Sequence, residues 1–271
     1  MNWDKLQEAI SYIQSQTEVK PVLGIVLGTG LGNLISEIEI EKEIEYEHIP
    51  NFPLSTVEFH TGKLIFGTLG NKLVVAMQGR MHPYEGYRMQ EVVFPIQVLK
   101  LLGIKHLLIS NAAGAINLDF KKGDLMIIID HIDLFPQHPL TGNNDNRLGT
   151  RFPDMSEAYD LRIREIMKSE AKALDLNIRE GIYISAQGPM LETPAEYRML
   201  RNLGGDAVGM STIPEVIAAN HMGLPCAAVS VLTDECDPDN LQPVNIEDII
   251  AVAGKTEKKL TALFVKVIEK M

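Results

Sequence analysis

Apolar and polar residues are distributed along the chain in two patterns. Short, nearly unbroken apolar runs are typical of strands buried on both faces, and they occupy residues 22–27, 106–109, 124–129, 180–186 and 225–232. Longer segments with helical character accompany them, at residues 3–14, 89–102, 157–173, 194–204 and from 246 onward. The alternation predicts an α/β sandwich whose mixed, largely buried central sheet is flanked by helices.

Local signals define a helix start and a hairpin. Thr193 can cap a helix that begins at Pro194, and Glu196 completes a capping box three residues later. Two alternating runs, residues 63–69 and 72–78, are joined by a Gly-Asn pair and predict a β-hairpin.

Other segments give further expectations. The acidic segment 38–47 is expected to be solvated, and a helix is expected to begin near Leu31. Pro95 is expected to bend the helix 89–102. Asn245 can cap the last helix, which carries acidic residues in its first turn.

Length and composition argue against several classes of protein. The 271 residues can form one large domain, and nothing in the sequence requires a boundary within residues 1–271. The formal net charge of −11 argues against a surface for nucleic acid or an anionic membrane, because such surfaces need basic residues. No apolar run reaches the length of a membrane span, and we expect a soluble, cytoplasmic protein.

Neither disulfide nor metal chemistry is indicated. Cys226 and Cys236 are the only cysteines and form no C-x-x-C motif, and the histidines form no H-E-x-x-H motif. His131 stands between Asp130 and Asp133, but no third ligand lies nearby in the sequence, which favours a structural role. We expect no metal.

Chemically versatile side chains follow the predicted strands. Glu192 lies in a loop after the run 180–186, and Met210 and Ser211 follow a short apolar run at 206–209. Ligands of open α/β sheets bind beyond the carboxyl ends of the strands, where a helix start can also hold an anion. Taken singly, each residue has an ordinary alternative interpretation as a solvated acid, core filling or a helix cap.

Two other strand ends carry groups suited to an anion. The sequence G-T-G-L-G-N-L begins at Gly28, and its spacing fails the dinucleotide fingerprint G-x-G-x-x-G. Its backbone and the Thr29 hydroxyl could hold a phosphate, or the segment could be a tight turn. After the hairpin, Arg80 and His82 are close enough to grip one anion. Alternatively, Arg80 pairs with Glu85, and His82 is a satisfied loop histidine.

Further candidates come from the remaining strand ends. Tyr84 brings an amphipathic ring, and Asn111, in S-N-A-A-G, can both donate and accept among small neighbours that allow a ligand to approach. Asp234 is either an active-site acid or a solvated loop acid. The polar loop 136–153 carries Phe152, and loops of this length are usually functional or mobile.

Five motifs resemble, in order and in near-family spacing, those of the trimeric purine nucleoside phosphorylases. They are G-T-G-L-G-N-L at 28–34, G-R-M-H-P-Y-E-G-Y at 79–87, S-N-A-A-G at 110–114, Q-G-P-M-L-E-T-P-A-E at 187–196 and G-M-S-T-I-P-E-V at 209–216. The resemblance covers essentially the whole chain. It implies a homotrimer that reversibly phosphorolyses purine ribo- and deoxyribonucleosides to the base and pentose 1-phosphate, with inorganic phosphate as co-substrate and no cofactor.

The resemblance also implies residue roles. A phosphate pocket would be formed by Thr29, Arg80, His82, the backbone N–H of Ala112, and Ser211. A nucleoside pocket would be formed by His60, Tyr84, Asn111, Phe152, Glu192, Met210 and Asp234, with Phe152 lent by a neighbouring subunit. The implied catalytic residues are His82, Asn111, Glu192 and Asp234.

The reaction fits these residue types. Breaking the glycosidic bond leaves an oxocarbenium-like sugar and a negatively charged purine. A phosphate dianion must therefore be held on one side, while the leaving base is stabilised on the other. Glu192 and Asp234 can serve the base.

Two positions depart from the family pattern. Asp234 stands where 6-oxopurine members usually have Asn, and it is the residue type that methylthioadenosine phosphorylases use against a 6-amino purine. Ile246 or a neighbour replaces a His that meets the 5′-hydroxyl in some members. The match around His82 and Tyr84 favours inosine and guanosine, and methylthioadenosine or adenosine is the alternative.

A non-catalytic nucleoside sensor is a further alternative. Retention of Arg80, His82, Glu192 and Ser211 together argues against decay of the site.

Overall fold

The computed structural model describes residues 3–28, 31–56 and 61–271, and within them it contains a nine-stranded mixed sheet. The strands are β1 (Leu23–Val26), β2 (Glu39–Glu45), β3 (Lys63–Leu69), β4 (Lys72–Gln78), β5 (His106–Ala115), β6 (Leu125–Ile132), β7 (Ile178–Ser185), β8 (Ala207–Gly209) and β9 (Cys226–Glu235). The helices are α1 (Trp3–Gln16), α2 (Met89–Val92), α3 (Phe94–Leu102), α4 (Leu161–Ala173), α5 (Pro194–Asn202), α6 (Ile213–His221) and α7 (Ile246–Lys270). Short 3₁₀ turns are η1 (Asn33–Glu37), η2 (Tyr46–His48) and η3 (Pro83–Glu85).

Part of the sheet closes on itself. The strand order is β2-β3-β4-β1-β5-β8-β7-β6-β9, and β9 pairs back onto β5. Strands β5, β8, β7, β6 and β9 therefore form a closed ring, and β2, β3, β4 and β1 extend from it as an open sheet. Parallel and antiparallel pairs both occur, as in the β1–β5 and β3–β4 pairs.

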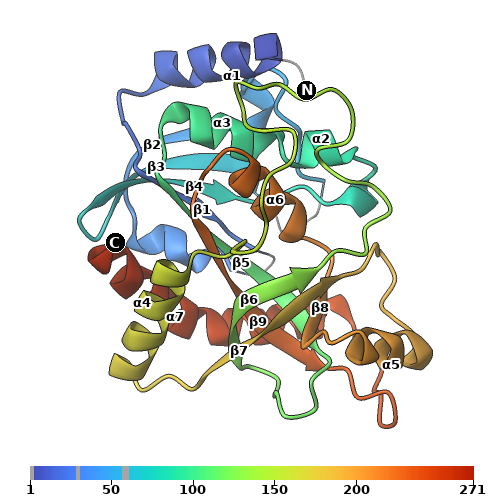
Figure 1. Cartoon of the computed structure of the whole chain (residues 1–271). Coiled ribbons are helices and arrows are strands. Elements are labelled where there is room, and N and C mark those ends of the chain that lie inside the picture. The colour runs from blue at the N-terminus through green and yellow to red at the C-terminus, as the bar shows by residue number, and fades with distance from the viewer. Residues whose placement is uncertain (1–2, 29–30, 57–60) are drawn as a thin grey trace.

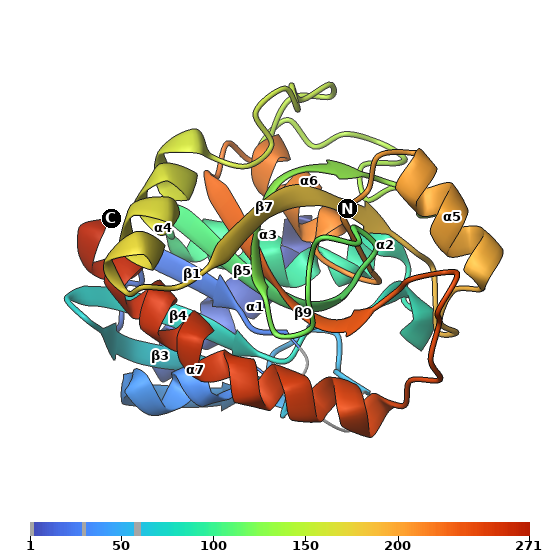
Figure 2. The same ribbon diagram turned by 90° about the horizontal axis from the view of Figure 1, so that it is seen from below.

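Helices cover both faces of the sheet (Figure 1). One apolar core joins α1, α3 and α6 to the face that carries Val26 and Ile109. The other joins α4 and α7 to the face that carries Ile25 and Leu108. Figure 2 shows α7 lying across this second face beside α4. The apolar strands are thus buried on both sides, and the predicted sandwich with a mixed, buried sheet is confirmed.

Several local predictions are also confirmed. Strands β3 and β4 form the expected antiparallel hairpin. The hydroxyl of Thr193 accepts from the Glu196 backbone N–H, and the Glu196 carboxylate accepts from the Thr193 N–H, so α5 begins with a capping box. The side chain of Asn245 accepts from the backbone N–H of Asp248 and caps α7.

The structure corrects the helix around Pro95. The prediction of one bent helix is wrong, because α2 ends at Val92 and α3 begins at Phe94. Proline has no N–H to donate and is tolerated within the first turn of a helix, where Pro95 stands in α3. Near Leu31 a 3₁₀ turn over Asn33–Glu37 replaces the expected helix.

Three strands differ from expectation. The acidic segment 38–47 contains β2, which pairs antiparallel with β3 and is mostly solvent-facing. Strand β5 continues through S-N-A-A-G instead of ending before it, and β9 extends to Glu235, so Asp234 lies in a strand and not in a loop.

Among the helices of the described ranges, none is long and apolar enough to cross a membrane.

Candidate active site

The candidate site opens where two strands separate along one edge of β5. Strand β1 pairs with His106–Ile109 of β5, whereas β8 pairs with Gly114 and Ala115. The stretch from Ser110 to Ala113 lies between these two partners and pairs with β9 on its other edge. A cavity of about 260 Å³ lies at this gap. The gap exists because β1 is short, so the edge of β5 is shared between two strands.

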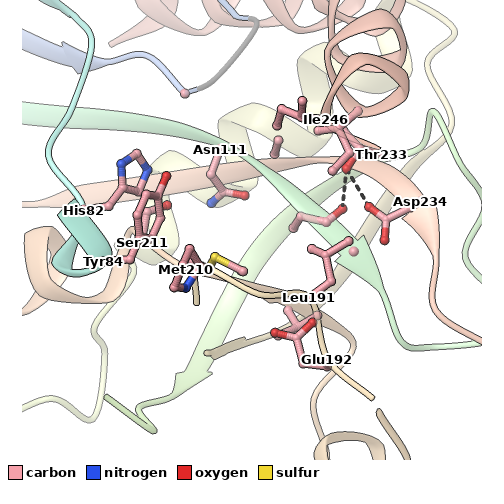
Figure 3. Close-up of a pocket in the computed structure, with 18 of the residues that line it drawn as sticks. His82, Tyr84, Asn111, Leu191, Glu192, Met210, Ser211, Thr233, Asp234 and Ile246 are labelled. Carbon is pink, nitrogen blue, oxygen red and sulfur yellow. Dashed lines mark hydrogen bonds between the residues drawn. The ribbon is translucent and has the colours of Figure 1, made fainter. Parts of the chain in front are cut away.

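Most of the predicted residues line this cavity (Figure 3). They are Arg80, His82, Tyr84, Asn111, Ala112, Glu192, Met210, Ser211 and Asp234. Thr29 and His60 lie outside the described residues. Gly28, which precedes Thr29, is at the cavity wall. A side chain at Gly28 would meet the backbone of Asn111 at 2.7 Å, so only glycine fits this approach of the two strands.

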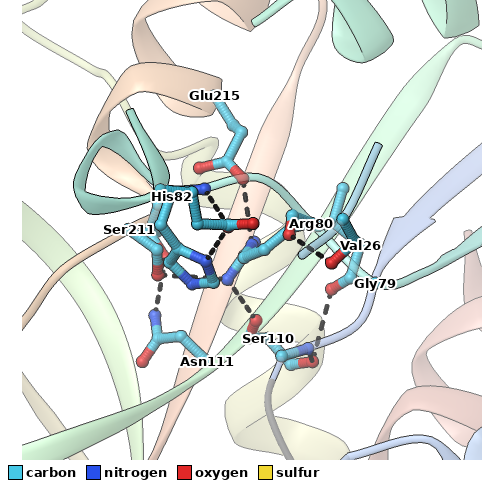
Figure 4. Close-up of polar contacts among 12 residues, drawn as sticks. Val26, Gly79, Arg80, His82, Ser110, Asn111, Ser211 and Glu215 are labelled. Carbon is cyan, nitrogen blue, oxygen red and sulfur yellow. Dashed lines mark hydrogen bonds and ion pairs between the residues drawn. The ribbon is translucent and has the colours of Figure 1, made fainter. Parts of the chain in front are cut away.

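Arg80 is a buried cation at one end of the cavity (Figure 4). Its Nε lies 3.0 Å from Glu215 Oε1, and its Nη1 donates to the Ser110 carbonyl at 2.9 Å and to Ser211 Oγ at 3.2 Å. The alternative pairing of Arg80 with Glu85 is wrong, since the partner carboxylate comes from α6. These contacts fix the guanidinium plane beside Ser211.

Glu85 instead orients His82. Its Oε1 lies 3.0 Å from His82 Nδ1 and accepts from the His82 backbone N–H at 2.7 Å. Burial alone would raise the pKa of Glu85, but hydrogen bonds from His82 and Thr56 outweigh it and lower the pKa to about 2. The His82 ring stacks on Tyr84 with ring centroids 4.7 Å apart. The contacts with Glu85 and Tyr84 fix the orientation of the His82 ring at the cavity wall.

Backbone strain occurs directly after Ser211, which lines the cavity. Thr212, directly before α6, has φ 72°, a conformation that is rarely adopted by a β-branched residue. Its hydroxyl accepts from Asn111 Nδ2 at 2.9 Å, which fixes the Asn111 amide. Asn111 Oδ1 is buried and has no hydrogen-bond partner among the described residues. A buried acceptor of this kind on the cavity wall suits a hydroxyl donor from a ligand.

Two acidic residues occupy the other end of the cavity. Asp234 is 7% exposed, and its Oδ1 accepts from the Thr233 hydroxyl at 2.8 Å. Burial raises the pKa of Glu192, and the nearby charge of Asp234 adds to this, against hydrogen bonds from its own backbone and from Tyr197. The cavity therefore has hydrogen-bond donors around Arg80 at one end and acidic side chains around Asp234 at the other.

A β-bulge explains how two consecutive residues of β9 reach the cavity. Ala113 pairs with Leu232, but Gly114 pairs with Asp234, so Thr233 is an extra residue in the ladder. Neighbouring strand residues normally point to opposite faces. The bulge turns Thr233 and Asp234 toward the same cavity, which they both line.

Comparison with known proteins identifies the family of this chain. Residues 22–269 match the model of the phosphorylase superfamily. Purine nucleoside phosphorylase 1 of Geobacillus stearothermophilus is 46% identical over 269 residues, which cover 99% of this chain and 97% of that protein. The chain belongs to the purine nucleoside phosphorylases of the phosphorylase superfamily.

Solved structures of the same family agree. Schistosoma mansoni purine nucleoside phosphorylase in complex with adenosine superposes with a TM-score of 0.94 at 42% identity, covering 100% of this chain and 98% of that chain. The same enzyme in complex with inosine superposes with a TM-score of 0.93 at 41% identity, covering 100% and 97%.

In this phosphorylase, several residues of the site were missed by the sequence analysis. Glu215, the partner of Arg80, follows Pro214 in the first turn of α6, and an acid within the apolar start of this helix was the available signal. Tyr197, Thr233 and Ile249 also line the cavity. Ile246 lines the cavity as well; by the family resemblance, Ile246 or a neighbour stands where some members have a His near the 5′-hydroxyl.

Phe152 and His131 lie elsewhere. Phe152 is 85% exposed and borders a separate recess beside the loop 136–153. His131 Nδ1 is 3.0 Å from the Tyr159 hydroxyl, which gives it a structural partner. Within the described ranges, the cluster with ligand spacing for a metal is the exposed group Glu45, Glu47 and His48, and not the residues around His131.

The lowered pKa of Glu85 makes stability depend on pH. Because the pKa is about 2 in the folded protein and 4.5 without its partners, the carboxylate stabilises the fold above pH 4.5, and this contribution disappears as pH falls toward 2. Glu85→Gln should lower the free energy of unfolding by about 1 kcal/mol at neutral pH, allowing for solvent screening. Urea unfolding at stepped pH should show the two proteins converging in acid. A difference that does not change with pH would contradict the assignment.

Proposed function

We propose that this chain catalyses the reversible phosphorolysis of purine ribonucleosides and deoxyribonucleosides to the free base and pentose 1-phosphate. The observation that carries the proposal is the polarity of one cavity, with Arg80, His82 and Ser211 at one end and Glu192 and Asp234 at the other. A phosphate dianion suits the first end, and a purine with ring N–H donors suits the second. The relatives named as purine nucleoside phosphorylases support this reading.

The proposed mechanism uses these two ends together. Arg80, His82 and Ser211 hold phosphate. Asn111 Oδ1 accepts a hydrogen bond from a sugar hydroxyl. Phosphate then attacks the anomeric carbon as the glycosidic bond lengthens, and negative charge develops on the purine. Glu192 accepts from a ring N–H, and Asp234 faces the edge of the base that carries the six-position group and the seven-position nitrogen. No cofactor is proposed beyond the co-substrate phosphate.

The preferred base is inferred from one motif, residues 79–87. The match around His82 and Tyr84 favours inosine and guanosine. A second candidate, an adenosine or methylthioadenosine phosphorylase, is supported by the Asp234 carboxylate, which is placed in the cavity with its Oδ1 already accepting a hydrogen bond. The Schistosoma mansoni relative has been crystallised with inosine and with adenosine.

The assembly is also a proposal. A homotrimer would bring the exposed Phe152 of one subunit to the ribose of a neighbouring site, which accounts for a phenylalanine ring that is 85% exposed. The cytoplasmic location stays a prediction from the sequence.

Phosphate binding is tested at Ser211. Arg80→Ala would leave the Glu215 carboxylate buried without its cation and would destabilise the fold, so it is a poor probe. Ser211→Ala removes one hydroxyl and should raise the KM for phosphate about tenfold, with a much smaller change in the KM for inosine. Ser230→Ala is the control, because its hydroxyl is buried without a partner among the described residues. Equal changes in both KM values would reject Ser211 as a phosphate ligand.

Asp234 is tested by comparing substrates. Asp234→Asn should keep substantial phosphorolysis of inosine and reduce any activity on adenosine, since a carboxylate suits the exocyclic amino donor. Steady-state rates on both nucleosides measure the change. Glu235→Gln is a matched control, because Glu235 is an exposed neighbour that pairs with Lys121. Loss of inosine turnover with intact adenosine turnover would show that Asp234 does not discriminate at the six position.

The shared site is tested by mixing subunits. Phe152→Ala should raise the KM for the nucleoside about tenfold, because a large apolar contact is lost while the fold survives. After unfolding and refolding together, Phe152→Ala and Glu192→Ala chains should recover activity above the sum of the two proteins alone. A neighbour that keeps Phe152 would then complete a site that keeps Glu192. A fully active monomer in sedimentation would refute the lent ring.

A further inference from the structure

A buried thiol contacts one of the two acids of the cavity. The Cys236 thiol donates to Asp234 Oδ2 at 3.1 Å. Tyr197 lines the same cavity. Asp234 is thus contacted on both carboxylate oxygens, because Thr233 donates to Oδ1. The catalytic proposal above uses neither Tyr197 nor Cys236.

The thiol is built into a fixed position. Cys236 is 1% exposed, and its backbone N–H donates to the Ala115 carbonyl at 2.8 Å, which ties it to the end of β5. A side chain at Gly114 would come within 2.6 Å of the sulfur and 3.0 Å of Asp234 Oδ2. Glycine at this position therefore leaves the room in which the thiol and the carboxylate meet.

The thiol is also a donor under ordinary conditions. Burial and the neighbouring Asp234 charge raise the pKa of Cys236 well above the usual thiol range, so the sulfur keeps its proton. With both oxygens accepting from protein groups, Asp234 is presented to the cavity as a hydrogen-bond acceptor.

We propose that Cys236 is a positioning residue that holds Asp234 as an acceptor and thereby shifts base selectivity toward 6-amino purines. The inference rests on the proposed function, in which Asp234 faces the six-position group. Without the thiol, Oδ2 loses its donor, and the carboxyl group can turn away from the six-position group of the base. The contact that favours an amino donor and opposes the oxygen of a 6-oxopurine is then weakened.

The test compares Cys236→Val, which removes the donor, with Cys236→Ser, which keeps a hydroxyl donor. Calorimetry of adenine and hypoxanthine binding to the full chain gives one selectivity ratio, and turnover of adenosine and inosine at saturating phosphate gives another. Cys236→Val should shift both ratios toward the 6-oxopurine by about three- to tenfold, the range expected for one lost hydrogen bond. Cys236→Ser should stay within about twofold of the unchanged chain.

Two further variants separate positioning from packing. Cys226→Val is the matched control, since Cys226 is equally buried at the other end of β9 and its thiol donates to the Ala158 carbonyl. It should leave both ratios unchanged. In an Asp234→Asn background, Cys236→Val should change the ratios by less than about twofold, because an uncharged amide gives the thiol no carboxylate to hold.

The outcomes are distinct. Unchanged ratios in Cys236→Val, or an equal shift with and without Asp234→Asn, would overturn the inference in favour of simple packing. A shift in Cys236→Ser as large as that in Cys236→Val would overturn it too. If the unchanged chain turns over neither nucleoside, the proposed function fails, and the base-binding ratios still decide the role of Cys236. If neither base binds, both proposals are overturned.

Discussion

The site depends on a buried cation that must be paired. The Arg80 guanidinium is 1% exposed, and a charge taken out of water is tolerated only with close partners. Its partners come from three parts of the chain: Ser110 in β5, Ser211 after β8 and Glu215 in α6. The ion pair thus joins the end of the hairpin strand β4 to the start of α6. In the proposed reaction, this rigid arrangement would present phosphate with donors that need no reorganisation.

The acidic end of the cavity is organised differently. No cation pairs with Asp234 in the contacts that the structure describes; its oxygens accept from a hydroxyl and a thiol. Glu192 is half-buried, and its pKa is raised mainly by that burial. Neutral donors orient the Asp234 carboxyl group, whereas the charge of Arg80 at the other end is balanced by Glu215. The two ends therefore differ in the groups that they present to the cavity, which are donors at one end and acceptors at the other.

Much of the fold followed from local sequence signals. The apolar runs, the hairpin at 63–78, the Thr193 capping box and the Asn245 cap each depend on residues close in sequence, and the structure contains all of them. Most candidate site residues were found because they follow predicted strands, and ligands gather at strand ends. What could not be predicted depends on contacts between distant segments.

Two particular cases show this limit. Glu215 was not assigned to Arg80, because their pairing follows from the way α6 packs over the sheet and not from spacing in the sequence. Asp234 was expected in a loop. Instead, β9 passes through the bulge at Thr233 and continues to Glu235, so Asp234 lies in the strand. A bulge depends on how two strands pair, so it leaves little trace in either strand alone.

The same bulge links the closed ring of strands to the chemistry proposed for the site. Strand β9 pairs along one edge of β5, and β1 and β8 share the other edge. On that second edge, β5 therefore changes partners within its ten residues. The ladder between β5 and β9 is irregular at Gly114, close to where β8 replaces β1. Extra twist at a bulge accommodates such a change. The same irregularity turns Thr233 and Asp234 toward the cavity, so the way β9 pairs with β5 decides where the acid is placed.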